Sequence, residues 1–445
     1  MYTRKHLKST GVAIIGGAVS QFGQFESLNS RDLVYQAFTE TVNSVDKGFD
    51  PSEIDELFIG NFTNDSFEGQ AHLGHLIADW LGLTPLPASR IEGACASGGL
   101  AFRQAVNSIK SGTSKKALVI GGEKMANTKL SLVQDYLAIA ADVSIEVDQC
   151  SFTFPAFYAV MASAYMEKYS MTRKPLMKVA IKNHDNASTN PKAQINLSIR
   201  QIIEKKTSKL DQTVDNKVLW DDEFQFLSDL KQNPLVSSPL HLFDCAPITD
   251  GAACLIIANE EIASKFTDSY VNILASEQAS AGPLYTWGSD ITSIPSSRDA
   301  SIKAFNSAGL NPSDIDLAEV HDCFTPAEIM AIEDIGFFPK GQGGQATLAG
   351  ETEKSGNLPV NISGGLKAKG HPVGATGVAQ LVELWAQLSN KAGARQLSKQ
   401  RLNLGLAHNV GGTGGTCVIS ILAVSYTHLR AHETLRYLVC RLLLE

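Results

Sequence analysis

One cysteine stands in a run of small residues that suits a nucleophile. Cys95 lies in the sequence Glu92-Gly-Ala-Cys-Ala-Ser-Gly-Gly-Leu-Ala-Phe-Arg, and a helical pattern begins at Leu100. This pattern predicts a sharp strand-to-helix turn with the sulfur near a helix N-terminus, where free amides and the helix dipole favour a thiolate. An activated nucleophile fits this setting, and so does a small cysteine buried in a glycine-rich turn. The residue alone leaves both interpretations open.

A glycine-rich loop carries a candidate base for that thiol. Residues 361–377 read Asn-Ile-Ser-Gly-Gly-Leu-Lys-Ala-Lys-Gly-His-Pro-Val-Gly-Ala-Thr-Gly. Such a loop lets backbone approach a ligand closely. Its one imidazole, that of His371, could hold Cys95 ionised. Lys367 and Lys369 are expected to be exposed to solvent, the alternative being contact with the phosphates of a ligand.

Two further segments place reactive side chains beside expected strands. The sequence His321-Asp-Cys-Phe follows an apolar run at residues 317–320. A histidine and a cysteine at a strand end can both transfer protons, although Cys323 taken alone is more simply a buried core thiol. The segment Leu404-Gly-Leu-Ala-His-Asn-Val-Gly-Gly-Thr-Gly-Gly-Thr-Cys417 has glycines between two β-like runs. It opens no clear helix, which excludes a Rossmann dinucleotide site.

An internal repeat predicts the elements that position these residues. Residues 50–55 read Asp-Pro-Ser-Glu-Ile-Asp and residues 311–316 read Asn-Pro-Ser-Asp-Ile-Asp. Each follows a helical segment that opens with Arg-Asp and precedes a short apolar run. A looser match relates the small-residue helix starts at 95–101 and 374–379. Coincidence is the alternative, because Pro-Ser is a common helix start. The shared order of elements predicts two α/β halves, each with a layered sheet.

The same patterns divide the chain into four parts. We predict an N-terminal half from residues 1–124 plus 246–268, a loop domain from 125–245, a C-terminal half from 269–424 and a non-native tail from 425–445. The inserted region is polar with long amphipathic stretches, and is expected to form helices and loops over the first half. The tail resembles a translated cloning or sequencing adapter, the alternative being a genuine terminal helix.

Composition excludes several classes of protein. The 445 residues carry a formal net charge of -8, and no clustered basic excess indicates nucleic-acid binding. No stretch of 18 apolar residues occurs, so no membrane span is expected. The seven cysteines form no CxxC pair and have no zinc-ligand spacing with histidine. We therefore expect a reducing compartment and no metal site.

Taken together, these segments resemble the thiolase superfamily, specifically its sterol-carrier-protein-2-type and acetyl-CoA acetyltransferase branch. The most specific pieces are Gly-Ala-Cys-Ala-Ser-Gly-Gly at 93–99, His-Asp-Cys-Phe at 321–324 and Gly-His-Pro-Val-Gly-Ala-Thr-Gly at 370–377. Residues 183–194 and 244–253 add weight, and the resemblance runs from about residue 11 to 424. It implies a duplicated five-layer αβαβα fold with an inserted helical loop domain that helps to hold coenzyme A.

The resemblance also implies a role for each reactive residue. Cys95 matches the acylated nucleophile, His371 its activating base, and His321 the residue that positions a water and the thioester oxygen. Most thiolases place a second catalytic cysteine in a Cys-x-Gly motif, where this chain reads Asn409-Val-Gly. In the branch that it resembles, Cys323 supplies the acid/base thiol instead. The implied coenzyme A contacts are His184, Ser363, Gly364, Gly411 and Gly412.

The implied reaction makes or breaks the C2–C3 bond of a 3-oxoacyl-CoA by way of an acyl-cysteine, with coenzyme A as substrate and no metal or redox cofactor. A cytoplasmic homodimer or homotetramer is expected. Two alternatives stay open: a thiolase-like aldolase or ketosynthase acting with an OB-fold partner protein, and a non-catalytic subunit that binds coenzyme A or lipid. Aldolase-type relatives tend to lose the nucleophilic cysteine, which is present here. Acyl chain length and physiological direction are not fixed by the sequence.

Overall fold

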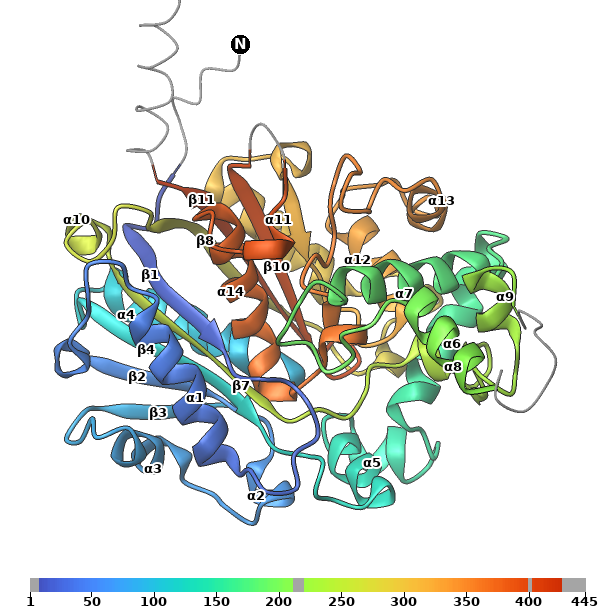
Figure 1. The fold of residues 1–445 in the computed structure, drawn as a ribbon, viewed down its shortest axis with the longest axis horizontal. Coiled ribbons are helices and arrows are strands. Elements are labelled where there is room, and N and C mark those ends of the chain that lie inside the picture. The colour runs from blue at the N-terminus through green and yellow to red at the C-terminus, as the bar shows by residue number, and fades with distance from the viewer. Residues whose placement is uncertain (1–7, 211–219, 399–401, 426–445) are drawn as a thin grey trace, which may run out of the picture.

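The computed structural model describes residues 8–210, 220–398 and 402–425 (Figure 1). Within them, one nine-stranded sheet has the order β3-β2-β4-β7-β1-β8-β11-β10-β9. The strands are β1 (Val12–Val19), β2 (Glu56–Gly60), β3 (Ala88–Ile91), β4 (Lys116–Glu123), β7 (Gly251–Asn259), β8 (Val271–Ser280), β9 (Leu317–Glu319), β10 (Leu404–Gly411) and β11 (Thr416–Val424). A separate hairpin is formed by β5 (Leu235–Ser237) and β6 (Leu240–His241).

The second half of the sheet repeats the pairing of the first. β2 is parallel to β4, β4 antiparallel to β7 and β7 antiparallel to β1. Likewise β9 is parallel to β10, β10 antiparallel to β11 and β11 antiparallel to β8. The two repeated Pro-Ser segments form matching 3-10 turns, Pro51–Glu53 before β2 and Pro312–Asp314 before β9. The halves join where the first residues of β1 pair with β8.

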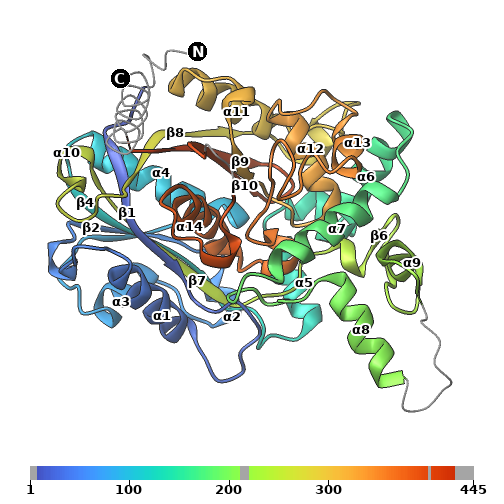
Figure 2. The ribbon, with the colours of Figure 1, turned by 45° about the horizontal axis from the view of Figure 1, so that its top comes forward.

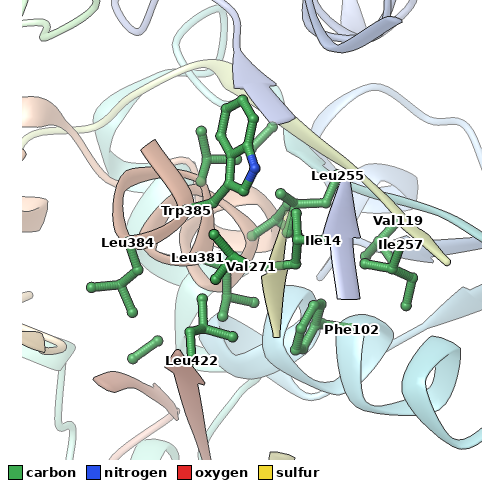
Figure 3. Close-up of a cluster of buried hydrophobic side chains, with 14 of the residues drawn as sticks. Ile14, Phe102, Val119, Leu255, Ile257, Val271, Leu381, Leu384, Trp385 and Leu422 are labelled. Atoms are coloured by element: carbon green, nitrogen blue, oxygen red, sulfur yellow. The ribbon is translucent and has the colours of Figure 1, made fainter. Parts of the chain in front are cut away.

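Helices cover both halves and also separate them. On one outer face lie α1 (Ser30–Asn43) and α3 (Leu73–Trp80), on the other α11 (Pro295–Ala308) and α12 (Thr325–Asp334), and between the halves α4 (Ser97–Lys110) and α14 (Thr376–Leu388). Because strand side chains alternate between faces, Ile15 packs toward α1 whereas Ile14 packs toward the middle layer. Figure 3 shows this middle cluster, in which Phe102 and Trp385 lie among strand residues of both halves. The predicted five-layer α/β fold is confirmed.

The inserted region packs on the other half from the one that we expected. It contains α5 (Leu130–Ala138), α6 (Phe154–Lys168), α7 (Lys174–Ala187), α8 (Ile199–Leu210) and α9 (Glu223–Ser228). Figures 1 and 2 show α6 and α7 beside α12 and α13 (Gly343–Leu348). Helix α5 reaches the first half at the short helix α2 (Asn64–Phe67), and Lys192 reaches it at Glu40 on α1. An amphipathic pattern predicts that a helix packs, but it does not identify the surface that receives it.

The remaining elements complete the described chain. Helix α10 (Glu260–Ala263) follows β7. No helix of the described residues has the length and apolar character needed to cross a membrane. The predicted non-native tail lies outside the described residues, apart from Ser425.

Candidate active site

Two glycine-rich helix starts cross at the centre of the molecule. A 3-10 turn, Ala94–Ala96, leads into α4, and a matching turn, Val373–Ala375, leads into α14. A Cβ atom on Gly98 would lie 2.7 Å from the carbonyl oxygen of Gly374, and one on Gly377 would lie 2.4 Å from the amide nitrogen of Gly99. The two backbones approach this closely because side chains are absent. The crossing brings the residues just before each helix, Cys95 and His371, to the same place.

The site gathers groups from three distant segments. The sulfur of Cys95 and one ring nitrogen each of His321 and His371 all lie within 4.8 Å of one another. The two imidazoles meet edge to face, with ring centroids 5.2 Å apart. Cys323 is buried, and its sulfur interacts electrostatically with that of Cys95. All four residues for which we expect catalytic roles therefore line one site.

The hydrogen bonds of His371 fix which nitrogen faces that site. The Thr376 hydroxyl donates its only proton to the carbonyl oxygen of Pro372, 3.1 Å away. It can therefore only accept from Nδ1 of His371, at 2.7 Å. Nδ1 carries the hydrogen, and the lone pair on Nε2 is free to accept a proton from Cys95. Thr376 was not singled out from the sequence, where it is one small residue of a glycine-rich loop.

Both members of this pair are neutral in the resting protein. Burial raises the pKa of the Cys95 thiol to about 12, although amide hydrogens of Gly412 and of Cys95 itself oppose the shift. Burial lowers the pKa of His371 to about 3, and the nearby charge of Lys369 acts in the same direction. The backbone amides favour the thiolate, as expected, but loss of solvation outweighs them. A proton can pass from the Cys95 thiol to the neutral imidazole of His371.

His321 presents a hydrogen-bond donor to the site. The Oδ1 atom of Asn409 accepts from the amide of Gly99 at 3.1 Å, so its Nδ2 is the donor. That nitrogen donates to the Cys95 carbonyl oxygen at 2.9 Å and faces Nδ1 of His321 at 3.5 Å. Nδ1 then accepts and Nε2 carries the hydrogen. Nε2 is buried without a hydrogen-bond partner among the described residues, so it can stabilise an oxyanion.

The sequence interpretation assigned no role to Asn409, which stands where most thiolases are expected to carry a second catalytic cysteine. Its amide connects the nucleophile loop, the first turn of α4 and His321. The only signal in the sequence was the departure from that motif.

A tyrosine from the inserted region reaches Cys323. Tyr158 packs in one buried cluster with Cys323, and its ring stacks on Phe324 with centroids 4.7 Å apart. Burial raises the pKa of Cys323, and the Cys95 sulfur adds to this, whereas the Tyr158 hydroxyl lowers it. Sequence analysis missed Tyr158, because only the amphipathic pattern of its helix was visible.

Asp322 fastens the His-Asp-Cys-Phe segment to two other parts of the fold. Its carboxylate accepts from the amides of Leu366 at 2.6 Å and Lys367 at 3.2 Å, and from Nδ2 of Asn183 at 2.7 Å. Asn183 lies on α7 and also donates to Glu328 at 2.9 Å. Burial raises the pKa of Asp322 to about 7, and the charge of Glu328 adds to the shift. The network joins the catalytic segment to the glycine-rich loop and to the loop domain.

Glu123, like Asp322, joins separate segments of the site by accepting hydrogen bonds from their backbone amides. It accepts from the amides of Phe62 at 2.9 Å, Thr63 at 3.1 Å and Gly374 at 3.1 Å. Burial raises the pKa of Glu123 to about 7, although these amides oppose it. The carboxylate thus holds the turn after His371 against the ends of β2 and β4.

Three of the expected coenzyme A contacts are engaged inside the protein. His184 is fully buried, with Nδ1 3.0 Å from the Leu197 carbonyl oxygen and Nε2 unpartnered among the described residues. The Ser363 hydroxyl donates to Glu319 at 2.5 Å. Gly364 has a φ of 104°, and a Cβ there would lie 2.6 Å from Ala187. Their role toward coenzyme A stays a prediction.

The other two expected contacts, Gly411 and Gly412, lie against the nucleophile. A Cβ on Gly411 would lie 2.2 Å from the Gly93 carbonyl oxygen, and the Gly412 amide lowers the pKa of the Cys95 thiol against the effect of burial. This position suits stabilisation of a thioester oxygen, and contact with coenzyme A remains a prediction.

The two lysines of the glycine-rich loop are buried, so the expectation that they are exposed is wrong. The Lys369 ammonium contacts the Ser363 hydroxyl at 2.9 Å and lies 3.9 Å from Glu319. The Lys367 ammonium lies over the ring of Phe243, 5.6 Å from its centroid. Partners from distant segments thus replace water around both charges.

A cleft of about 470 Å³ opens beside the nucleophile. Phe62, Ala94, Ala140 and Gly411 are among the residues that line its apolar part, and Asp65, Arg90 and Glu92 lie on its wall as well. Cys95 packs in the same apolar cluster as Phe62, Ala94 and Ala140. The cleft is thus lined by both chain neighbours on the N-terminal side of Cys95, Gly93 and Ala94, whereas the sulfur itself lies outside its lining.

The three converging donors could also hold a soft divalent metal ion. A thiolate and two imidazoles are ligands that Zn²⁺ prefers. We expected no metal site because the sequence shows no local spacing, but Cys95, His321 and His371 come from three separate segments. The same atoms are those that an acyl transfer needs, so a metal there would compete with that chemistry.

Comparisons with known proteins agree with this architecture. The family model described as "Thiolase, N-terminal domain" matches residues 12–261, and "Thiolase C-terminal domain-like" matches 278–424. An acetyl-CoA acetyltransferase of Methanothermobacter thermautotrophicus is 40% identical over 93% of this chain and 99% of its own length. Sterol carrier protein 2 of Homo sapiens is 30% identical over 95% of this chain and 74% of its own.

Solved structures share the fold at lower identity. An Ltp2-ChsH2(DUF35) aldolase has a TM-score of 0.73 at 22% identity, covering 95% of this chain and 100% of that one. Human mitochondrial 3-ketoacyl-CoA thiolase in complex with CoA has a TM-score of 0.65 at 17% identity, covering 94% and 100%. The family models span nearly the whole described chain, and the reactive residues meet where its two halves cross. The chain belongs to the thiolase family.

Proposed function

We propose that this thiolase is an acetyl-CoA C-acyltransferase that cleaves or forms the C2–C3 bond of a 3-oxoacyl-CoA. One observation carries the proposal: the Cys95 sulfur, the free nitrogen of His371 and the donor nitrogen of His321 converge in one site, with the second thiol of Cys323 beside them.

In the degradative direction, the Cys95 sulfur attacks the 3-oxo carbon while its proton passes to Nε2 of His371. The C2–C3 bond breaks, and its electron pair leaves with acetyl-CoA as an enolate. The thiol of Cys323 gives its proton to C2, and coenzyme A then takes the acyl group from Cys95. In the synthetic direction, the Cys323 thiolate removes a proton from C2 of acetyl-CoA, and the enolate attacks acylated Cys95.

Each direction develops negative charge on an oxygen, and the site offers two kinds of donor. The amides of Gly412 and Cys95 face the nucleophile's sulfur, where the acyl oxygen forms. Nε2–H of His321 can bind the enolate oxygen, directly or through a water. A single placed donor of this kind contributes roughly 10²–10³-fold to the rate.

Two half-reactions test the proposal separately. Incubation with acetyl-CoA should add an acetyl mass to the peptide that contains Cys95. In deuterated buffer the enzyme should exchange the C2 protons of acetyl-CoA, and Cys323→Ala should acetylate Cys95 yet lose this exchange. An acetyl label found only on another residue contradicts the assignment of Cys95 as the nucleophile. Normal exchange in Cys323→Ala contradicts the assignment of Cys323 as the acid/base.

The same experiments separate the alternative functions. An aldolase that needs an OB-fold partner would release no coenzyme A from acetoacetyl-CoA alone, and a carrier would show neither half-reaction. The likeness in fold to an aldolase solved with a DUF35 protein supports testing such a partner, but the presence of Cys95 favours acyl transfer by this chain.

The assembly and compartment are proposals of the same kind. A homodimer or homotetramer is in keeping with the family, and β3 ends the sheet with an edge open to pairing with a second copy. The six cysteines among the described residues are all free, which supports a reducing compartment such as the cytoplasm. Light scattering and fractionation test these two points.

A further inference from the structure

A tyrosine of the inserted region lies beside both sulfurs of the site. The Gly412 amide lowers the pKa of the Cys95 thiol against the effect of burial, and the carbonyl oxygen of the same residue lies 3.4 Å from the Tyr158 hydroxyl. Tyr158 packs in one buried cluster with Cys323, and its hydroxyl lowers the pKa of that thiol. Tyr158 is fully buried, so water does not compete for its hydroxyl. Its phenol is thus a polar group that the loop domain places beside Cys323.

The hydrogen bond from the Tyr158 hydroxyl to the Gly412 carbonyl oxygen is weak enough for the hydroxyl to donate to another acceptor instead. A distance of 3.4 Å is at the weak end for an O–H···O hydrogen bond, which is usually 2.5–3.0 Å. A thiolate is a stronger acceptor than a peptide carbonyl at that distance, because hydrogen bonds to charged groups are roughly twice as strong. The stacking of the Tyr158 ring on Phe324 fixes where the hydroxyl can point.

We propose that Tyr158 is a positioning residue for the acid/base thiol: its hydroxyl donates to the Gly412 carbonyl while Cys323 is a thiol, and donates to the sulfur when Cys323 is a thiolate. The inference rests on the proposed function and deepens it. It makes the loop domain part of the carbon–carbon bond step, in addition to its expected part in holding coenzyme A.

The proton balance is simple. When the Cys323 thiolate removes a proton from C2 of acetyl-CoA, an S–H bond forms, a C–H bond breaks, and the electron pair moves onto the thioester oxygen. The Tyr158 hydroxyl keeps its own proton throughout and changes only the atom to which it donates. In the cleavage direction the same steps run backwards, and the thiolate left after C2 is protonated is stabilised by the hydroxyl.

A purely structural role makes a different prediction from this one. If Tyr158 served only to pack against Phe324, removing the hydroxyl while keeping the ring would change neither half-reaction. If it held the whole site together, both half-reactions would fall together. A role specific to the Cys323 thiolate slows proton exchange at C2 and leaves acetylation of Cys95 intact.

The test compares Tyr158→Phe with a matched control, Tyr165→Phe. Tyr165 lies on the same helix, is buried, and directs its hydroxyl to Glu333 rather than to either sulfur. For each purified full-length protein, NMR follows deuterium exchange at C2 of acetyl-CoA, and mass spectrometry follows acetylation of Cys95. We expect Tyr158→Phe to lower the exchange rate about 10- to 100-fold, the usual range for loss of one donor to a charged group, with acetylation within about twofold of wild type. Tyr165→Phe should leave both rates unchanged.

Each other outcome overturns the inference. Exchange at the wild-type rate in Tyr158→Phe shows that the hydroxyl does not act on Cys323, and an equal fall in both half-reactions shows a general packing role. Failure of the proposed function looks different, because wild-type protein would then lack the half-reactions altogether and both proposals would be contradicted.

Discussion

Replacing Asp322 by asparagine should weaken both the fold and the carbon–carbon bond step. Oδ1 accepts from the Leu366 amide, and Oδ2 accepts from the Lys367 amide and from Asn183. An asparagine can keep only one of these oxygens, and its NH₂ group must then face hydrogen-bond donors. Asp322 is fully buried, so water cannot take over the lost bonds.

The expected loss of stability follows from the donors left without a partner. If the remaining oxygen stays on Leu366, the Lys367 amide and one hydrogen of Asn183 lose their acceptor. Each unsatisfied buried donor costs about 1–3 kcal/mol, which gives about 2–6 kcal/mol in all. Removing a buried carboxylate beside Glu328 returns part of this, since burial and that neighbour raise the pKa of Asp322 to about 7. We therefore expect a loss of about 2–4 kcal/mol.

Urea denaturation measures this loss, and the two half-reactions locate its effect. Asp322→Asn should slow exchange at C2 more than acetylation of Cys95, because the carboxylate holds the segment that carries Cys323. The exposed Asp148, in the inserted region, gives the matched control, and Asp148→Asn should change the free energy of unfolding by less than about 0.5 kcal/mol. An Asp322→Asn protein as stable as wild type would refute the reasoning.

Three further predictions test other parts of the site. Thr376→Val removes the acceptor that fixes the tautomer of His371, so quench-flow should show acetylation of Cys95 slowed at least about 10-fold; an unchanged rate would mean that the base needs no such support. Burial lowers the pKa of His184 to about 3, so the folded protein binds no proton there until about pH 3, whereas the unfolded chain binds one below about pH 6.5. The contribution of the neutral imidazole to the free energy of unfolding is therefore present above pH 6.5 and is lost as the pH falls. Between pH 7 and 5 the wild type should therefore lose about 2 kcal/mol more stability than His184→Gln, and parallel unfolding curves would contradict this. Added Zn²⁺ should block acetylation and EDTA should restore it, whereas acetylation indifferent to the ion would show that the three donors do not converge.

Turn chemistry and repetition made much of the fold predictable from sequence. The Pro-Ser segments at 51–52 and 312–313 each open a 3-10 turn before a buried strand, and that local conformation depends mainly on residues within the segment. The short apolar run after the first Pro-Ser segment likewise forms β2, and the second β-like run beside the glycines of residues 411–415 forms β11. Sequence signals predict a turn or a strand well where its conformation depends mainly on neighbouring residues.

Properties that depend on distant partners could not be predicted in this way. Lys367 and Lys369 look like solvent-exposed residues, and only Phe243, Ser363 and Glu319, supplied by the fold, explain their burial. The net pKa of Cys95 could not be predicted for the same reason, since the number of atoms around the sulfur determines how much solvation it loses. Tyr158 was not predicted because nothing in the sequence of its own helix indicates that it packs beside a cysteine more than 150 residues away.

The duplication itself explains why the site lies where it does. Each half contributes a 3-10 turn leading into an inner helix, and the two helices approach closely at glycines, so the turns before them are neighbours. Cys95 lies inside the first turn, and His371 lies just before the second. His321 follows β9 and Asn409 lies on β10, and these two strands are adjacent and parallel. A fold built from two like halves thus brings together side chains that are not themselves equivalent in the repeat, and the inserted region then adds Tyr158 and Asn183, for which the repeat has no counterpart.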